Sequence, residues 1–556
     1  MSLPLFTAQS ELFSVAGCSR ELFSATDRYR LFAAKVYPVL AQVRSKLEAC
    51  YCTDNGRVAV EPALLMGVSL LQYLEGIPDR QAVEMLRYHT GWNFALNRHV
   101  GDDLFHPTTL VNFRQRLVEH DLSAVGFQAV LDALIEAGLV ARKCRQRLDS
   151  TQMFGRVSRM SRLDCVRESL RLALQELAES LPEAQRPDWW GELWDNYVES
   201  QTDYRAPLET LARKMVEAGQ AAQRVLGWLA GASDQKLVQA KQGQLLARVF
   251  QEQFEVVPEA ADAQPKTKGQ LSSERVQNPH DPDATYASKG RGEQCKEHVG
   301  YKVQVAETVT EAVLEPGEPT QNFIVGVLTH AARESDEEGA CKMEAEQKTM
   351  GLEKSPVQYV DAAYVSTEKL VEARAEGREL IGPAPHSGGP NSERFQSEDF
   401  QVDVEQRRAT CPARHPNSQC SRLEEKATGK VSFRFEWDTV TCAHCSFRLK
   451  CIKAEHRHRT LVVSENHSVL QARRIEQKTD EFKTRLKHRN AIEGTQSELV
   501  RAHGLRRARY RGLAKTKLQN YFIGAACNVK RWFRRLAWEA RQSLSGFPVD
   551  TAQPAN

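Results

Sequence analysis

Apolar residues recur at helical spacing over residues 26–140, and this pattern predicts a mostly helical N-terminal region. The stretch EPALLMGVSLLQYLEG (61–76) is one clear example. Another helix is expected to begin at HPTT (106–109), and four residues are expected on its buried face: Phe105, Leu110, Phe113 and Leu117. Its other face is basic, which suits either a solvated face of a helical bundle or a small DNA-binding domain.

After Arg145 the pattern changes from helical spacing to strands. RQRLDSTQMFG (145–155) reads as a strand, and later strands are expected at 298–309, 322–330, 356–365 and 379–385. A helix is expected at 366–377, between the last two strands. A strand, a helix and a strand in this order are typical of a βαβ unit, whose two strands are parallel.

Other segments interrupt this pattern or follow it. Residues 160–255 return to amphipathic helix, 256–275 have the polar, Ala- and Pro-rich composition of a linker, and 396–465 are polar and contain five cysteines. Two helices are expected near the end, one from about 469 to 498 and one from about 516 to 541. We therefore divide the chain into the segments 1–140, 141–395, 396–465 and 466–545.

Composition and charge narrow the class of protein. The chain has 556 residues, of which 41% are hydrophobic and 26% charged, as in soluble globular proteins with several folding units. It has no apolar run long enough for a membrane span and no N-terminal secretion signal, and its 13 cysteines fit a reducing cytoplasm. From Arg501 to Arg535 there are eleven Lys or Arg and no acid, which predicts a polyanionic partner.

Three acids have settings that suit metal-dependent phosphate chemistry. Asp149 lies within the strand 145–155, Asp361 ends the apolar stretch VQYVD, and Glu493 lies on an expected helix. If the two strands are parallel neighbours, both aspartates can reach one edge of the sheet. Two-metal cleavage needs such convergent carboxylates, although an Asp at a strand end is more often a turn or cap residue. Two carboxylates ~4 Å apart repel by roughly 4 kcal/mol, so a fold gathers them where it expects a cation.

The segments RLDSTQMF, YVDAAY and RNAIEGTQSEL, followed by HGLRRARYRG and NVKRW, resemble the DDE transposases of bacterial insertion sequences. Arg489 and Glu493 match the Arg-x-x-x-Glu part of that family's tyrosine–arginine–glutamate–lysine signature. Residues 61–117 resemble the helical domain that precedes the catalytic core in one large subgroup, as do DPDATY (281–286) and GYKVQVAET.

The resemblance implies an α/β fold with a ribonuclease-H-like catalytic core. An N-terminal helical domain, a helical insertion and a small Cys-containing insertion would accompany this core. Asp149 would lie on the first core strand, Asp361 just after the fourth, and Glu493 on a later helix. These acids would hold two Mg²⁺ or Mn²⁺ ions that support cleavage of the element ends and strand transfer into target DNA. The partner would be double-stranded DNA, bound by a homodimer in the bacterial cytoplasm at the nucleoid.

Two positions depart from the family signature. Leu486 stands where the tyrosine is expected, and Val500 stands where the lysine is expected. A DNA contact could be weakened there or moved to Lys487 or Arg501. Glu498 is an alternative third acid. Asp281 and Asp283 are less favoured alternatives, because DPD before Ala more often makes a turn.

Two other functions remain open beside transposition. A nuclease with a ribonuclease-H-like core could use the same acids without joining strands. A transposase-derived regulator could bind DNA without cutting it, and the two departures from the signature keep this alternative open.

The segment 396–465 contains a possible structural Zn²⁺ site. CAHC (442–445) has the spacing of a zinc knuckle, and His415 and His444 are spare ligand candidates. The five cysteine candidates are Cys411, Cys420, Cys442, Cys445 and Cys451. Unpaired structural thiols are the alternative, and redox chemistry is less favoured.

The basic stretch RAHGLRRARYRGLAKTK alternates arginines and lysines with aromatic residues and glycines, a pattern that can follow a phosphate backbone. A solvated basic face on a packing helix is the alternative. The residues expected to contact DNA are Arg489, Arg501, Arg506, Arg507, Arg509, Arg511 and Lys515.

Overall fold

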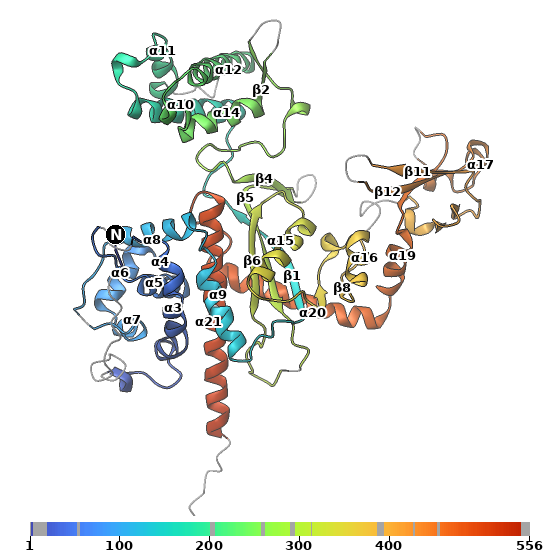
Figure 1. Cartoon of the computed structure of the whole chain (residues 1–556). Coiled ribbons are helices and arrows are strands. Elements are labelled where there is room, and N and C mark those ends of the chain that lie inside the picture. The colour runs from blue at the N-terminus through green and yellow to red at the C-terminus, as the bar shows by residue number, and fades with distance from the viewer. Residues whose placement is uncertain are drawn as a thin grey trace, which may run out of the picture.

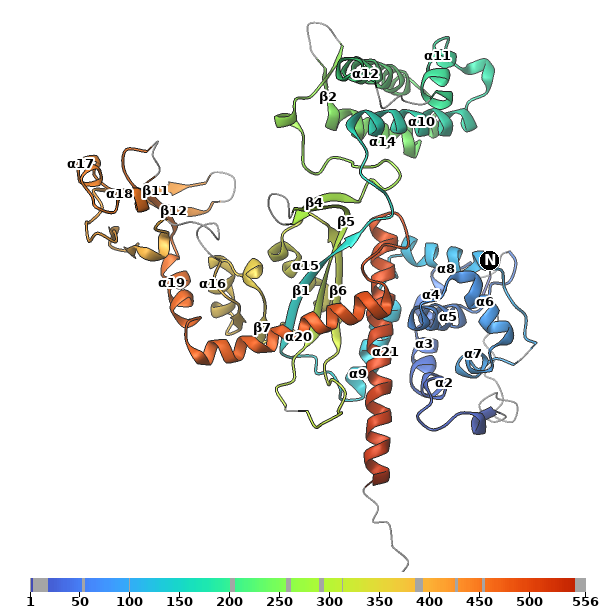
Figure 2. The same cartoon turned by 180° about the vertical axis from the view of Figure 1, so that it is seen from behind.

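The computed structural model is a mixed α/β structure (Figures 1 and 2). It describes residues 2–3, 19–52, 56–99, 101–200, 206–256, 262–289, 295–312, 314–385, 394–425, 429–452 and 456–545. Every structural statement below concerns these ranges.

The N-terminal region is helical, as the apolar spacing predicts. Its longest helix, α5, begins after Glu61, whose carboxylate accepts the Ala63 N–H, and ends at Gly76 in the left-handed conformation (φ 69°). Phe105, Leu110, Phe113 and Leu117 are all buried, which confirms the predicted inner face of α8. The helices are α2 (Arg28–Leu31), α3 (Tyr37–Gln42), α4 (Arg44–Glu48), α5 (Pro62–Glu75), α6 (Asp79–Tyr88), α7 (Thr90–Ala95), α8 (Thr108–Glu119) and α9 (Val125–Glu136).

A six-stranded sheet forms the centre of the molecule. Its path runs β4-β5-β1-β7-β8, with β6 also pairing with β5, and β1 is antiparallel to β5 but parallel to β7. The helix α16 (Thr367–Ala375) joins the parallel strands β7 and β8, which confirms the predicted βαβ unit. The strands are β1 (Gln146–Phe154), β4 (Thr285–Lys289), β5 (Lys296–Thr308), β6 (Ile324–Ala331), β7 (Val357–Tyr359) and β8 (Glu379–Ile381).

Three helices after β8 complete the central part of the molecule. The charged helix predicted from 469 is in fact two helices, α19 (His467–Glu476) and α20 (Asp480–His503), because the Thr479 hydroxyl caps a new helix by accepting the Phe482 N–H. The helix α20 packs on β1, β7 and β8. The last helix, α21 (Leu513–Ser545), packs on β6 as well as on α5 and α9, and α15 (Asp336–Thr349) also packs on β6.

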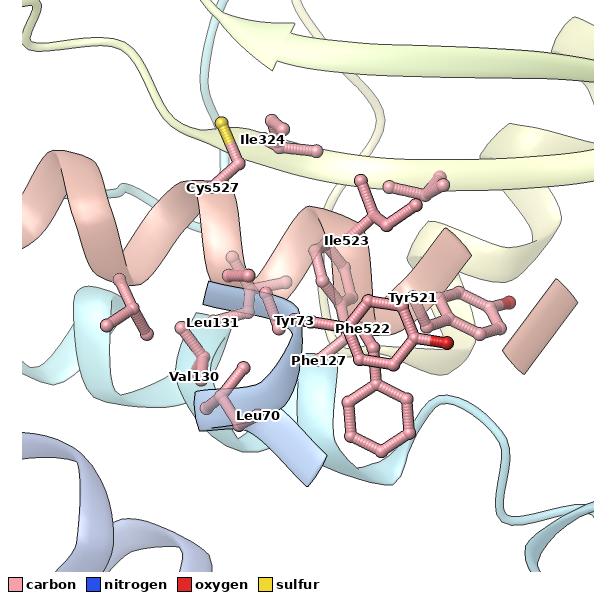
Figure 3. Close-up of a cluster of buried hydrophobic side chains, with 14 of the residues drawn as sticks. Leu70, Tyr73, Phe127, Val130, Leu131, Ile324, Tyr521, Phe522, Ile523 and Cys527 are labelled. Atoms are coloured by element: carbon pink, nitrogen blue, oxygen red, sulfur yellow. The ribbon is translucent and has the colours of Figure 1, made fainter. Parts of the chain in front are cut away.

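One continuous hydrophobic core links the N-terminal helices to the sheet. Figure 3 shows its centre, where Phe127, Val130 and Leu131 of α9 meet α21. Tyr73 of α5 stacks on Phe522 of α21 with ring centroids 5.2 Å apart. Because α21 contributes to both sides of this core, it fixes the N-terminal helices against the sheet.

The helical insertion between β1 and β4 has a core of its own. The polar stretch 256–275 contains more structure than a linker, because β3 pairs with β2 and both Ala263 and Phe254 are buried in this core. In Figure 1 the insertion stands beyond one end of the sheet. Its elements are α10 (Arg162–Ser180), α11 (Trp190–Trp194), α12 (Leu208–Ala230), α13 (Gln235–Val238), α14 (Lys241–Gln253), β2 (Phe254–Val256) and β3 (Ala263–Pro265).

The cysteine-rich segment forms a separate small lobe beside α19 (Figures 1 and 2). It contains a two-stranded and a three-stranded sheet with two short helices. These elements are β9 (Gln401–Asp403), β10 (Arg408–Thr410), β11 (Gln419–Glu424), β12 (Val431–Glu436), α17 (Thr439–Ala443), α18 (Arg448–Cys451) and β13 (Thr460–Ser464).

Candidate active site

The parallel pairing of β1 with β7 brings the two aspartates to one level of the sheet. Arg147 on β1 is in register with Tyr359 on β7. Asp149 and Asp361 each follow two residues later, so they fall at matching positions on neighbouring strands. Asp361 also caps a short 3₁₀ helix (Ala362–Tyr364) by accepting the Ala363 N–H at 2.9 Å. This cap holds its carboxylate beside the end of β7.

The helix α20 adds a third carboxylate and an arginine to this edge. Arg489 and Glu493 are four residues apart and share one face of the helix, with Arg489 Nη1 3.5 Å from Glu493 Oε1. Arg489 Nη2 donates to Asp149 Oδ2 at 3.2 Å and lies 4.0 Å from Asp361 Oδ2. The three predicted acids therefore surround one guanidinium group. Glu493 is exposed and Asp361 is half-buried, whereas Asp149 is buried.

The surroundings of Asp149 disfavour the ionised form of its carboxyl group. Burial raises the pKa of Asp149 to about 6. The Ser150 N–H and the Arg489 guanidinium work against this rise, whereas the charges of Asp361 and Asp336 add to it. A cation placed among these carboxylates would remove the repulsion and lower the pKa again.

A buried ionic network holds α20 against the sheet. Glu307 on β5 is fully buried, and its carboxylate accepts hydrogen bonds from Arg147, Arg531 and Thr495. Thr495 lies on α20 and Arg531 on α21, while Arg147 also donates to the His488 carbonyl at 3.1 Å. The network thus joins both helices to the strand that carries Asp149.

Sequence reasoning missed this network and one further acid. Glu307 sits in an apolar strand, and an acid in such a position was the available signal, because a buried carboxylate needs a partner. Asp336, at the start of α15, is near enough to raise the pKa of Asp149, and it pairs with Lys302 at 3.1 Å. Nothing in the sequence distinguishes Asp336 from an ordinary first-turn helix acid.

The alternative acids are engaged elsewhere. Glu498 pairs with Arg531 at 2.9 Å and with Arg534 at 3.4 Å. Asp281 accepts the Gly512 N–H at 3.0 Å, and Asp283 accepts the Leu513 N–H at 2.9 Å. Asp281 and Asp283 therefore stabilise the positive N-terminal end of α21 rather than joining the cluster.

Leu486 and Val500, the two residues that depart from the expected signature, both make apolar contacts. Leu486 packs against a small buried cluster that includes Tyr359 and Phe482. Val500 packs against the main core, and its neighbour Arg501 is exposed. Lys487 is exposed as well. The two side chains expected to be polar are thus replaced by ones that add to packing.

The predicted DNA-contacting residues fall into two groups. Arg489 lies among the three acids, and Arg509 is half-buried with its guanidinium 4.7 Å from the Tyr73 ring centroid. The others are exposed: Arg501, Arg506, Arg507, Arg511 and Lys515. The backbone of residues 506–508 bonds to Phe154 at the end of β1, which fixes this basic segment beside the sheet.

The five cysteines lie in the small lobe, and none of them forms a disulfide. Cys442 and Cys451 are buried in the lobe's core, and Cys411 and Cys420 pack against that core.

Comparison with protein families identifies two matching regions. Residues 410–533 match a family model described as a transposase DDE domain, and residues 18–116 match one described as a transposase domain (DUF772). The first match includes Arg489 and Glu493 but neither of the two aspartates. Neither a curated protein nor a solved structure matches the chain. Within the described ranges, no helix combines the length and the apolar content needed to cross a membrane.

Proposed function

Because the chain belongs to the DDE transposases of insertion sequences, we propose that it cuts the ends of its element and joins the freed 3′ ends to target DNA. Asp149, Asp361 and Glu493 are the proposed ligands of the divalent ions. The observation that carries this proposal is the meeting of these three carboxylates, from β1, the end of β7 and α20, around Arg489.

The order of the strands supports a ribonuclease-H-like core. The strand β1 has the antiparallel strands β5 and β6 on one side and the parallel strands β7 and β8 on the other. This is the arrangement that lets a first-strand acid and an acid after the fourth strand share one edge. The N-terminal helices, the helical insertion and the cysteine-rich lobe would then be additions to this core.

The donor set fits magnesium or manganese, which prefer hard carboxylate oxygens. When bound, two such ions would activate a water or hydroxyl nucleophile and would stabilise the leaving oxygen. The protein's own part is to hold Asp149 and Asp361 at one level and to carry Glu493 across the sheet edge on α20. A serine or tyrosine nucleophile is not needed, so no covalent link between protein and DNA is expected.

Arg489 would have two consecutive roles. Before the ions bind, its guanidinium balances the charges of the three carboxylates and reduces the repulsion between them. When the ions are bound, the same side chain is freed and can contact a DNA phosphate. Leu486 makes no such contact, so the exposed Lys487 and Arg501 are the proposed replacements for the missing signature residues.

The exposed arginines of the basic segment would hold double-stranded DNA beside the acids. Arg506 and Arg507 lie beside the end of β1, the strand that carries Asp149. Two copies of the chain would pair the two element ends, in the bacterial cytoplasm where the nucleoid lies.

The test is a cleavage and joining assay on DNA carrying the element ends, with Mg²⁺ or Mn²⁺. Asp361→Asn is expected to lower both reactions by about 10³-fold or more while leaving DNA binding intact. Glu353→Gln, at an exposed acid away from the site, is the matched control and should react like wild type. Nicks without joined products would support a nuclease. Binding of ends with no cutting by wild type in either metal would support a regulator.

A further inference from the structure

The cysteine-rich lobe has too small an apolar core for its length. Among the described residues of the lobe, nine form its buried core, and two of these are cysteines. The strand β11 is almost entirely exposed, and its partner β12 buries only one side chain well. Small folding units of this kind usually need a disulfide or a metal ion in addition to their core. The lobe's cysteines form no disulfide, so their thiols are available as metal ligands.

Hydrogen bonds bring the first cysteine turn and the later cysteines together. Cys411 begins a tight turn in which Arg414 takes a positive φ of 64°. Within this turn the His415 N–H donates to Cys411 Sγ at 3.4 Å. The indole N–H of Trp437 donates to the His415 carbonyl at 2.9 Å, and Trp437 stands just before α17. The helix α17 carries Cys442, and the chain then reaches Cys445 and, at the end of α18, Cys451.

The core of the lobe brings thiols from different parts of its sequence together. Cys442 of α17 and Cys451 of α18 are buried in it, and Cys411 packs against it. Cys420 also packs against this core, but it lies within β11, opposite Phe435 of β12, rather than on a turn or a short helix. A metal ion would favour the thiolate form of the cysteines that bind it.

We propose that Cys411, Cys442, Cys445 and Cys451 bind one structural zinc ion, and that Cys420 takes no part. The spacing supports this set, because Cys442 and Cys445 form a Cys-x₂-Cys pair. No three of these sulfur atoms lie within 4.8 Å of one another in the described structure, so the ion has to draw them inward. The expected result is a lobe that is more ordered with zinc than without it.

A different group of donor atoms is closer together but fits a metal less well. Glu498, His503 and Cys527 have donor atoms within 4.8 Å of one another. However, the Glu498 carboxylate already accepts hydrogen bonds from Arg531. A metal ion there would lie against a buried guanidinium, so repulsion between the cations opposes binding.

The test measures metal in the purified full chain and does not depend on DNA cleavage. Wild type is expected to contain about one zinc ion per chain. Cys442→Ser and Cys451→Ser should each weaken zinc binding at least about tenfold. Cys420→Ser, in the same lobe, is the matched control and should keep wild-type zinc. Equal losses in Cys420→Ser and Cys442→Ser would overturn the proposed ligand set.

A spectroscopic measurement keeps the proposal testable if a serine variant fails to fold. Wild-type protein exchanged with Co²⁺ is expected to show thiolate-to-cobalt charge-transfer absorption and the visible bands of a tetrahedral site. The Cys420→Ser variant should give the same spectrum. Wild-type protein that binds no zinc and shows no thiolate bands with cobalt would overturn the proposal.

Discussion

At the scale of single residues, Arg489 is the most informative side chain of the candidate site. It lies within 4.0 Å of carboxylate oxygens from Asp149, Asp361 and Glu493. A guanidinium and a divalent ion satisfy the same negative charges, so an ion bound here would compete with Arg489. Arg489 neutralises part of the charge that the three carboxylates bring together.

The first prediction concerns this competition. Arg489→Gln removes the internal cation, so Mn²⁺ should bind about threefold to tenfold more tightly than in wild type. The gain is modest because Glu493 and Asp361 are partly solvent-screened. Cleavage should fall nevertheless, because the proposed phosphate contact is lost. Calorimetric titration with Mn²⁺ measures the affinity, and a weaker affinity in the variant would contradict the competition.

His503 gives the second prediction, which concerns pH. It is buried at the end of α20, and burial lowers its pKa to about 4. Below about pH 6.5 the unfolded chain takes up a proton that the folded chain refuses, so stability is full at neutral pH and falls as the pH decreases toward 4. Between pH 7 and pH 5 this group should cost about 2 kcal/mol.

Urea unfolding of wild type and His503→Gln at the two pH values measures this contribution. The variant should lose less stability than wild type on going to pH 5. Identical losses would contradict a lowered pKa of His503 in the folded chain.

At the scale of elements, the position of α20 depends on the buried network around Glu307. One fully buried carboxylate serves Arg147 from β1, Arg531 from α21 and Thr495 from α20 itself. The helix that carries Glu493 is thereby fixed to the strand that carries Asp149. Its geometry does not rest on apolar contacts alone.

The third prediction is that Glu307→Gln lowers the free energy of unfolding by about 3–5 kcal/mol. The buried Arg147 loses its counter-charge, and the buried Arg531 keeps only that of Glu498. Glu405→Gln, at an exposed acid, is the control and should change it by less than about 0.5 kcal/mol. Chemical denaturation measures both. A loss of under about 1 kcal/mol for Glu307→Gln would mean that the network does not hold α20.

Elements and site residues differed in how well the sequence predicted them. The strands β1, β5, β6, β7 and β8 and the helix between the last two were predictable because their apolar patterns are regular and local. The break between α19 and α20 was not, because a single threonine cap decides it. The matching positions of Asp149 and Asp361 depend on the pairing of β1 with β7, and the network of Glu307 depends on contacts between distant parts of the chain. A local sequence pattern does not encode such long-range contacts.

At the scale of the whole molecule, one core joins the N-terminal helices to the sheet, and the basic segment lies between them. On the side of the N-terminal helices, Arg509 lies over the ring of Tyr73 on α5, and the Tyr510 hydroxyl lies 3.4 Å from the Tyr73 hydroxyl. On the side of the sheet, the backbone of residues 506–508 bonds to Phe154 at the end of β1. DNA bound along residues 506–515 would therefore touch a surface to which both regions contribute. The helical insertion and the cysteine-rich lobe have cores of their own.

The fourth prediction follows from this arrangement. Arg506→Ala with Arg507→Ala removes two exposed cations next to the end of β1. If each contacts a phosphate, the slope of log affinity against log salt should decrease by about two, with an equal loss of affinity for all DNA sequences. Arg213→Ala, exposed on the helical insertion, is the matched control and should keep the wild-type slope.

Fluorescence anisotropy over a range of salt concentrations measures the slope. An unchanged slope in the double variant would place the DNA on another face, and an equal decrease for Arg213→Ala would mean that the contacts are not confined to the basic segment.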